Sequence, residues 1–69
     1  MSNRLLRWFA HNHLPAPLQG VSAACADLAE QVDTLLPESA EKTAGLRHLL
    51  EAKDCFVRAR LDDITDEDL

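Results

Sequence analysis

Between residues 18 and 35 the sequence carries a regular apolar stripe that few structures other than a packed helix can accommodate. The stripe consists of Leu18, Val21, Cys25, Leu28, Val32 and Leu35, which follow one another in steps of three and four. That spacing marks one face of an α-helix. Prolines at 15 and 17 suit a first helical turn, and Pro37 cannot continue the helix. We therefore expect a helix over residues 16–36 whose apolar stripe is either core or subunit contact.

A second helix is expected to follow after a short link. Ser39 is a good N-cap residue, and Glu41 places negative charge in the first turn. Apolar positions then recur at Leu46, Leu49, Leu50, Phe56, Val57 and Leu61. Short links favour antiparallel neighbours, so the prediction is an all-α hairpin with helices over 16–36 and 40–61 in one domain spanning 1–61. Residues 62–69 carry five acidic residues and are expected to form a mobile acidic tail.

The N-terminal segment, residues 4–14, holds most of the aromatic content and is expected to fold as a short helix across the hairpin. A chain of 69 residues buries only about 60% of the surface that it exposes when unfolded. A two-helix hairpin has a single buried seam, so other apolar side chains remain to be covered. We therefore expect the hairpins to assemble into a symmetric homo-oligomer.

Composition excludes several function classes. The formal net charge of −5 argues against general binding of duplex DNA. No apolar run approaches the roughly 18 residues of a membrane span. Two glycines are too few for a phosphate-binding loop or a dinucleotide fold, and the chain is too small for a conventional enzyme. We expect no cofactor and no catalytic residue.

The two cysteines, Cys25 and Cys55, lie inside the expected helices without the spacing of a disulfide framework. We expect buried small hydrophobic residues, with a helix-to-helix bridge as the alternative.

Several Lys and Arg side chains of the expected second helix could bind an anion. Lys42 and Thr43 stand at the start of the second helix, where free backbone N–H groups favour a phosphate, although Glu41 opposes one there. Lys53 falls on or beside the apolar stripe of the second helix. It either snorkels or pairs with an acid of a neighbouring helix, or it is a pocket lysine that faces an anion. Arg47 either contributes to such a pocket or pairs with Glu51.

A polar and aromatic cluster precedes the first helix. Trp8, Phe9 and His11 offer ring faces that stack on bases, and Asn12 can read a base edge. The alternative is that the two aromatic rings pack into the oligomer core with the histidines at its rim. A zinc site from His11, His13 and His48 would lack a second close ligand pair, so no metal is expected.

A longer pattern resembles a known family. Residues 36–54, LPESAEKTAGLRHLLEAKD, followed by FVRA at 56–59, resemble the helical-hairpin domain of small phage proteins. The Trp-Phe pair at 8–9 and the His-Leu-Pro run at 13–15 are similar to the same proteins. Members of known function are counter-defence sponges that antagonise CBASS and Thoeris, bacterial immune systems that signal through cyclic oligonucleotides or cyclic ADP-ribose derivatives.

The resemblance implies a non-enzymatic sponge. Sponges of this family form small oligomers, hexamers in the anti-CBASS branch, and sequester cyclic dinucleotides and cyclic trinucleotides uncleaved in separate pockets between subunits. They place an N-terminal aromatic against the base and Lys or Arg against the phosphates. In this chain the resemblance gives the aromatic role to Trp8, Phe9 or, by position, His11. The residues that would contact the phosphates through a cation or a hydroxyl are Lys42, Thr43, Arg47 and Lys53. Such a protein would act in the cytoplasm of the infected bacterial host.

The alternative is a helical protein–protein interaction module of a phage, without a nucleotide ligand. The two functions differ in where the cations point. Convergence of Lys42, Arg47 and Lys53 with an N-terminal aromatic side chain from another subunit favours the sponge, whereas cations that fan into solvent favour the interaction module.

Overall fold

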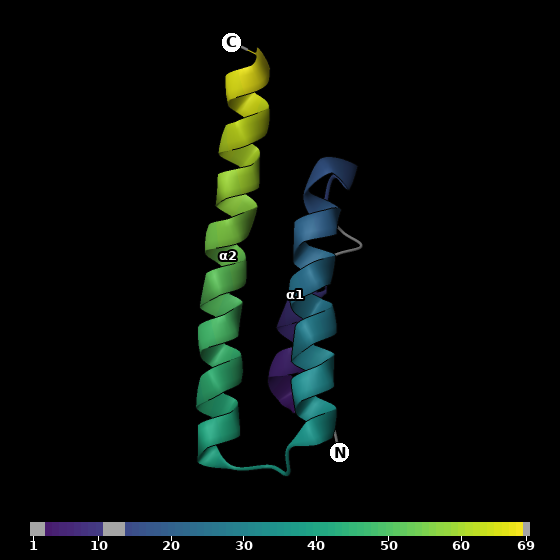
Figure 1. Cartoon of the computed structure of the whole chain (residues 1–69), viewed down its shortest axis with the longest axis vertical. Coiled ribbons are helices and arrows are strands. Elements are labelled where there is room, and N and C mark those ends of the chain that lie inside the picture. Colours follow the sequence, from purple (N-terminus) through teal and green to yellow (C-terminus); the bar gives the residue numbers. More distant parts are fainter. Residues whose placement is uncertain (1–2, 11–13, 69) are drawn as a thin grey trace.

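The computed structural model describes residues 3–10 and 14–68, with side chains up to residue 64. A short 3-10 helix, η1 (Arg4–Phe9), precedes two long helices, α1 (Ala16–Leu35) and α2 (Ala40–Asp68). The two long helices lie antiparallel and side by side, joined by the short link, and α2 continues well past the start of α1 (Figure 1). The predicted all-α hairpin with a short N-terminal helix is confirmed.

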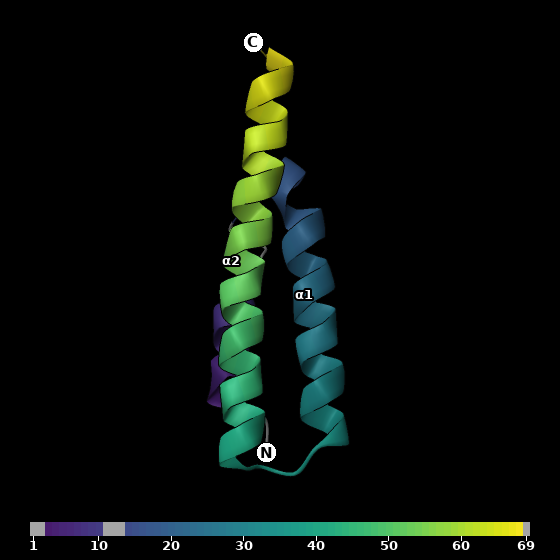
Figure 2. The ribbon, with the colours of Figure 1, turned by 60° about the vertical axis from the view of Figure 1, so that its left-hand side comes forward.

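Helix η1 crosses the half of the hairpin that lies nearest the link and packs against both long helices (Figure 2). Its N-cap is Asn3, whose side-chain Oδ1 accepts a hydrogen bond from the Leu5 backbone N–H at 2.9 Å. This cap satisfies a donor that the first turn would otherwise leave unpaired. The N-terminal segment therefore forms a third packed element of the fold.

The ends of α1 and α2 follow the local sequence. Pro15 and Pro17 flank the start of α1, and its last turn closes with a bond from the Leu36 N–H to the Val32 carbonyl at 3.1 Å. Ser39 caps α2, because its Oγ accepts from the Lys42 N–H at 3.0 Å. The predicted N-cap is therefore confirmed, and α1 ends one residue before the expected Leu36.

Helix α2 is longer than the apolar pattern indicates. The pattern ends at Leu61, but the helix continues to Asp68 through the segment expected to be a separate tail. Neither glycine nor proline occurs after Gly45, so no residue in this stretch stops a helix. Arg60 also forms an i,i+3 ion pair with Asp63, which supports the extension.

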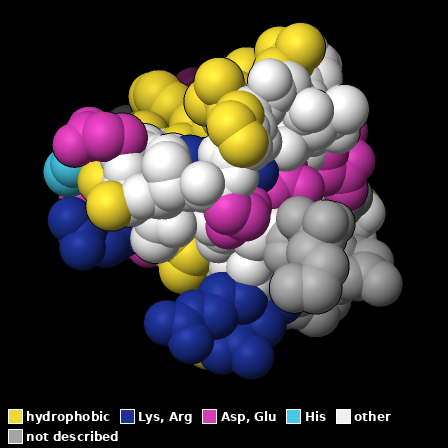
Figure 3. All heavy atoms as spheres, turned by 90° about the horizontal axis from the view of Figure 1, so that it is seen from below, with side chains coloured by type: hydrophobic (Ala, Val, Ile, Leu, Met, Phe, Trp, Pro, Cys, Tyr) yellow, Lys and Arg dark blue, Asp and Glu magenta, His cyan; other side chains and the backbone are white. Residues whose placement is uncertain are grey.

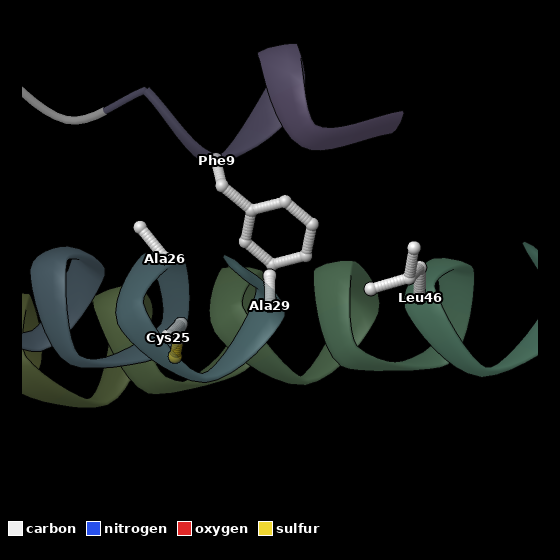
Figure 4. Packing of buried hydrophobic residues seen from close by; sticks show 5 residues of the cluster. All are labelled: Phe9, Cys25, Ala26, Ala29 and Leu46. Carbon is white, nitrogen blue, oxygen red and sulfur yellow. The ribbon is translucent and has the colours of Figure 1, made fainter. Parts of the chain in front are cut away.

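The core is small and lies where the three helices meet. Phe9 reaches from η1 toward Ala29 of α1, and Ala26, Cys25 and Leu46 complete the cluster (Figure 4). Ala29 and Leu46 are 0% and 1% exposed. Small side chains on α1 leave room for the ring, which explains why one phenylalanine fills this junction.

The buried face of α1 differs from the predicted stripe. The buried residues are Ser22, Cys25, Ala26 and Ala29, whereas Leu28 and Leu35 are 48% and 78% exposed. Of the two roles expected for the stripe, core or subunit contact, these two leucines do not take the first within the single chain. Because η1 covers one flank of α1, the buried face is rotated toward the small residues, and the leucines remain on the surface.

Both cysteines are free thiols. Cys25 is buried, as expected, but Cys55 is exposed, so the prediction of a buried residue is wrong there. No helix in the described part of the chain is long and apolar enough to cross a bilayer.

Candidate binding site

Lys42 lies in a buried polar cluster at the link end of the hairpin. Its ammonium group contacts Asp33 Oδ1 at 3.0 Å and Glu38 Oε1 at 2.7 Å. It also donates to the backbone carbonyls of Asp33 and Leu36 at 2.9 and 2.8 Å. Only 2% of the Lys42 side chain is exposed. The lysine therefore holds the end of α1, the link and the start of α2 together.

Asn3 ties the N-terminal segment into the same cluster. Its backbone N–H donates to Asp33 Oδ1 at 2.9 Å, and its side-chain amide donates to Glu38 Oε2 and Thr43 Oγ1, both at 3.1 Å. Thr43 thus acts as an acceptor for Asn3. The cluster anchors η1 and sets the position from which Trp8 and Phe9 extend.

The charges of this cluster stabilise one another. The hydrogen bond from the Asn3 N–H, followed by the contact with Lys42, lowers the pKa of Asp33 below its ordinary value of 3.8. The hydrogen bond to Glu38 is the largest effect on Lys42 and raises its pKa above 10.5, although burial opposes the shift. Both groups are therefore held in their charged forms at neutral pH.

Asp33 is expected to make folding stability depend on pH in the acid range. Because its pKa is lower in the folded than in the unfolded chain, its contribution is present above pH 3.8 and is lost as the pH falls through the folded-state pKa. The Lys42 contribution is fully present below pH 10.5, so it does not produce this acid loss. Asp33→Asn should lower the free energy of unfolding at pH 7. The difference in this free energy between the variant and the wild type should shrink progressively toward about pH 2, as measured by urea unfolding. Asp62→Asn, at an exposed position, is the control, and an equal difference at every pH would contradict the role of Asp33.

Trp8 and Phe9 have opposite environments. Phe9 is 2% exposed and belongs to the core, whereas Trp8 is 55% exposed. The guanidinium carbon of Arg7 lies 5.0 Å from the centroid of the Trp8 ring. This distance allows a cation–π contact and places a positive charge beside an open indole face.

Lys53 fixes the end of η1. Its ammonium group donates to the backbone carbonyl of Trp8 at 2.9 Å and lies 5.9 Å from the centroid of the Phe9 ring. Asp54 Oδ1 is 3.7 Å away, and 12% of the Lys53 side chain is exposed. The nearby acid belongs to the same helix, so it is not the ion pair with a neighbouring helix that the sequence suggested, and the contact with η1 is to a backbone carbonyl. The lysine still lines a shallow hollow together with Leu14, Asp54, Val57 and Arg58.

Arg47 is exposed on α2 and forms no ion pair with another described residue. Glu51, its expected partner, instead lies 3.6 Å from His48 Nδ1. His11 and His13 lie outside the described residues. Within the part of the chain that the structure describes, no three His, Cys, Asp or Glu side chains gather to hold a metal ion.

The predicted site residues do not meet in one pocket of a single chain. Lys42 and Thr43 serve the polar cluster, and Phe9 serves the core. Trp8 and Arg47 remain exposed. Asn3, Asp33 and Arg7 are not among the site residues predicted from the sequence. The Glu38-to-Lys42 spacing of four residues was a signal for an ion pair, but Asn3 reaches the cluster across 30 residues of chain and gives no local signal.

An apolar groove runs between α1 and α2. It is lined by Gly20, Val21, Ala24, Cys25, Leu28, Leu49 and Phe56. Leu28 and Phe56 are 48% and 54% exposed. Seen from the link end, hydrophobic side chains gather along the upper edge of the molecule, and Lys and Arg side chains lie at the lower edge and at the left (Figure 3).

Comparison with protein-family models, with curated proteins and with solved structures finds no match for this chain.

Proposed function

We propose that this chain is a non-enzymatic phage counter-defence protein that assembles into a homo-oligomer, a hexamer by its resemblance, and sequesters cyclic oligonucleotide messengers between subunits. The messengers are cyclic dinucleotides, cyclic trinucleotides or cyclic ADP-ribose isomers, and their capture in the host cytoplasm suppresses CBASS-type signalling. Sequestration needs only tight stoichiometric binding, since a nanomolar Kd corresponds to about −12 kcal/mol.

The observation that carries this proposal is the exposed pair of Trp8 and Arg7. An open indole stacks on a base, and a neighbouring guanidinium contacts a phosphate or a base face. Lys53 holds the Trp8 backbone in place, so the ring is presented from an anchored segment. Such pre-organisation reduces the entropy that binding would otherwise cost.

The structure also changes the roles that we assign. Trp8, Arg7 and Arg47 are proposed to contact the ligand, because their side chains are exposed. Lys42 and Thr43 are proposed as positioning residues, because their polar groups already bond within the chain. A single hairpin cannot surround a cyclic dinucleotide, so a second subunit must complete the pocket.

Arg47→Ala is expected to weaken messenger binding about tenfold and to leave the oligomer mass unchanged. The arginine has no ion-pair partner among the described residues, so its removal should not disturb the fold, and a charge-assisted bond to a phosphate would be lost. Titration calorimetry with the bound messenger measures the effect. Arg60→Ala is the matched control, because Arg60 pairs with Asp63. Equal affinities for the two variants would exclude Arg47 from the pocket.

The interaction module without a nucleotide ligand is the second candidate. The observation that favours it is that Arg47 is exposed to solvent and forms no ion pair with another described residue, whereas Lys42 is buried among acidic groups. A stable oligomer that binds none of the cyclic nucleotides would select this function.

A further inference from the structure

The shallow hollow beside Lys53 combines aliphatic walls with polar groups of both charges. It encloses about 310 Å³ and is lined by Leu14, Lys53, Asp54, Val57 and Arg58. Pockets that bind small molecules have volumes of about 300–1,000 Å³. The hollow lies at the lower end of this range, so its size suits one flat group such as a nucleobase.

Four of the lining residues form two neighbouring rows on α2. Asp54 and Arg58 are four residues apart, as are Lys53 and Val57, so each pair lies on one face of the helix. Leu14 contributes a wall from the segment that precedes α1. The hollow therefore offers two aliphatic side chains that can contact a ring, together with a carboxylate and two cations for the polar edge of that ring.

The charged groups of the hollow do not satisfy one another. Asp and Arg four residues apart on a helix often form an ion pair, but no ion pair joins Asp54 to Arg58 among the residues that the structure describes. Arg58 instead donates to Cys55 Sγ, a weak acceptor, at 3.4 Å. Asp54 Oδ1 lies 3.7 Å from the Lys53 ammonium group, which is too far for a hydrogen bond, and 53% of the Asp54 side chain is exposed. A carboxylate and a guanidinium group thus remain open to a ligand.

The hollow adjoins the residue to which we assign base stacking. The Lys53 ammonium group that lines the hollow also donates to the Trp8 carbonyl at 2.9 Å. Stacking on an indole does not distinguish one messenger from another, because every base has a π face. Selectivity therefore requires groups that reach the polar edge of a base, and the hollow supplies such groups next to the end of η1.

A carboxylate beside cations fits the edge of guanine better than the edge of adenine. A carboxylate only accepts hydrogen bonds, and guanine presents two adjacent donors, N1–H and the N2 amino group. Next to these donors lie O6 and N7, the acceptors that Arg and Lys contact when they recognise guanine. Adenine presents the N1 acceptor where guanine has its N1–H donor, so a carboxylate repels adenine at this edge.

We propose that the hollow beside Lys53 binds a guanine base of the sequestered messenger. Asp54 accepts from N1–H and the N2 amino group, Arg58 donates to O6 or N7, and Lys53 adds a second positive charge beside these acceptors. Leu14 and Val57 contact the ring. The inference rests on the proposed sponge function, and it narrows the messengers to those that contain guanine.

The ratio of the affinities for cyclic di-GMP and cyclic di-AMP tests this assignment, measured by titration calorimetry on the full chain. The wild type should bind cyclic di-GMP about tenfold more tightly or better, because only guanine pairs with the carboxylate. Asp54→Asn should remove most of this preference by weakening the binding of cyclic di-GMP, while the affinity for cyclic di-AMP stays nearly unchanged. The hypoxanthine analogue of cyclic di-GMP, which lacks the N2 amino group, should bind with an intermediate affinity.

Asp62→Asn is the matched control, because it makes the same change at an exposed position of α2 outside the hollow, and it should keep the wild-type ratio. Circular dichroism checks that both variants fold. Equal binding of guanine and adenine messengers, or a guanine preference that survives Asp54→Asn, would overturn the guanine site and leave the sponge function standing. A protein that binds none of the cyclic nucleotides would refute the sponge function and the guanine site with it. The two failures are therefore distinguishable.

Discussion

Leu28→Asp is expected to convert the proposed oligomer into monomers. Leu28 is 48% exposed in the single chain and lines the apolar groove, so the substitution should leave the hairpin folded. In the assembled state the new carboxylate would be buried without a partner, which costs several kcal/mol. Association should therefore weaken at least a hundredfold. Size-exclusion chromatography with light scattering measures the mass.

The control for this experiment is Leu61→Asp. Leu61 is 49% exposed, so the same chemical change occurs at an equally accessible leucine, but its helical position lies away from the groove. Leu61→Asp should retain the wild-type mass. If Leu28→Asp also retains it, or if both variants dissociate alike, the groove is not the contact between subunits.

Trp8→Ala is expected to remove most of the messenger binding without changing the oligomer mass or the melting temperature. Trp8 is 55% exposed and lies outside the core, so the fold does not depend on its ring. Stacking of an aromatic side chain on a base contributes about 1–3 kcal/mol. The expected loss of affinity is therefore about 5- to 150-fold, measured by titration calorimetry.

Trp8→Phe provides the matched comparison, because it retains a flat aromatic face and should recover much of the affinity. Phe9→Ala is not a suitable test, since it would empty the core. If Trp8→Ala binds as tightly as the wild type does, the N-terminal aromatic does not contact the ligand, and the proposed site must lie elsewhere.

The sequence predicts the hairpin because its local signals agree with one another. The prolines before α1, the short link containing Pro37 and the Ser39 cap each mark a boundary that the structure places within one residue. The exception is the end of α2. An apolar pattern shows where packing stops, but a helix can continue beyond its packed part where no residue interrupts it, and no glycine or proline follows Gly45.

The exposed leucines show what periodicity cannot resolve. Leu28 and Ala29 are neighbours, and the apolar pattern favours burial of the larger residue. Helix η1 inserts Phe9 against Ala29, so the small residue is buried and the leucine is turned toward the surface. Such a rotation depends on an element that is distant in sequence, and the spacing within one helix cannot reveal it.

The binding site was harder to predict than the fold, because a lysine near a helix start has the same local sequence whether it binds a phosphate or forms an ion pair. Lys42 near a capped helix start suggests a phosphate site, but its charge is satisfied by Asp33 and Glu38. Asn3 completes this cluster from the other end of the chain. The functional assignment therefore moves to Trp8, Arg7 and Arg47, whose side chains are exposed.

The most direct test of the sponge function is a native-mass titration of the purified protein against cyclic dinucleotides, cyclic trinucleotides and cyclic ADP-ribose isomers. The complex is then heated, and the released ligand is analysed. The account predicts an oligomer that binds at least one of these messengers in a fixed number per assembly and releases it intact. A stable oligomer that binds none of them, or a protein that returns the ligand cleaved, would contradict it.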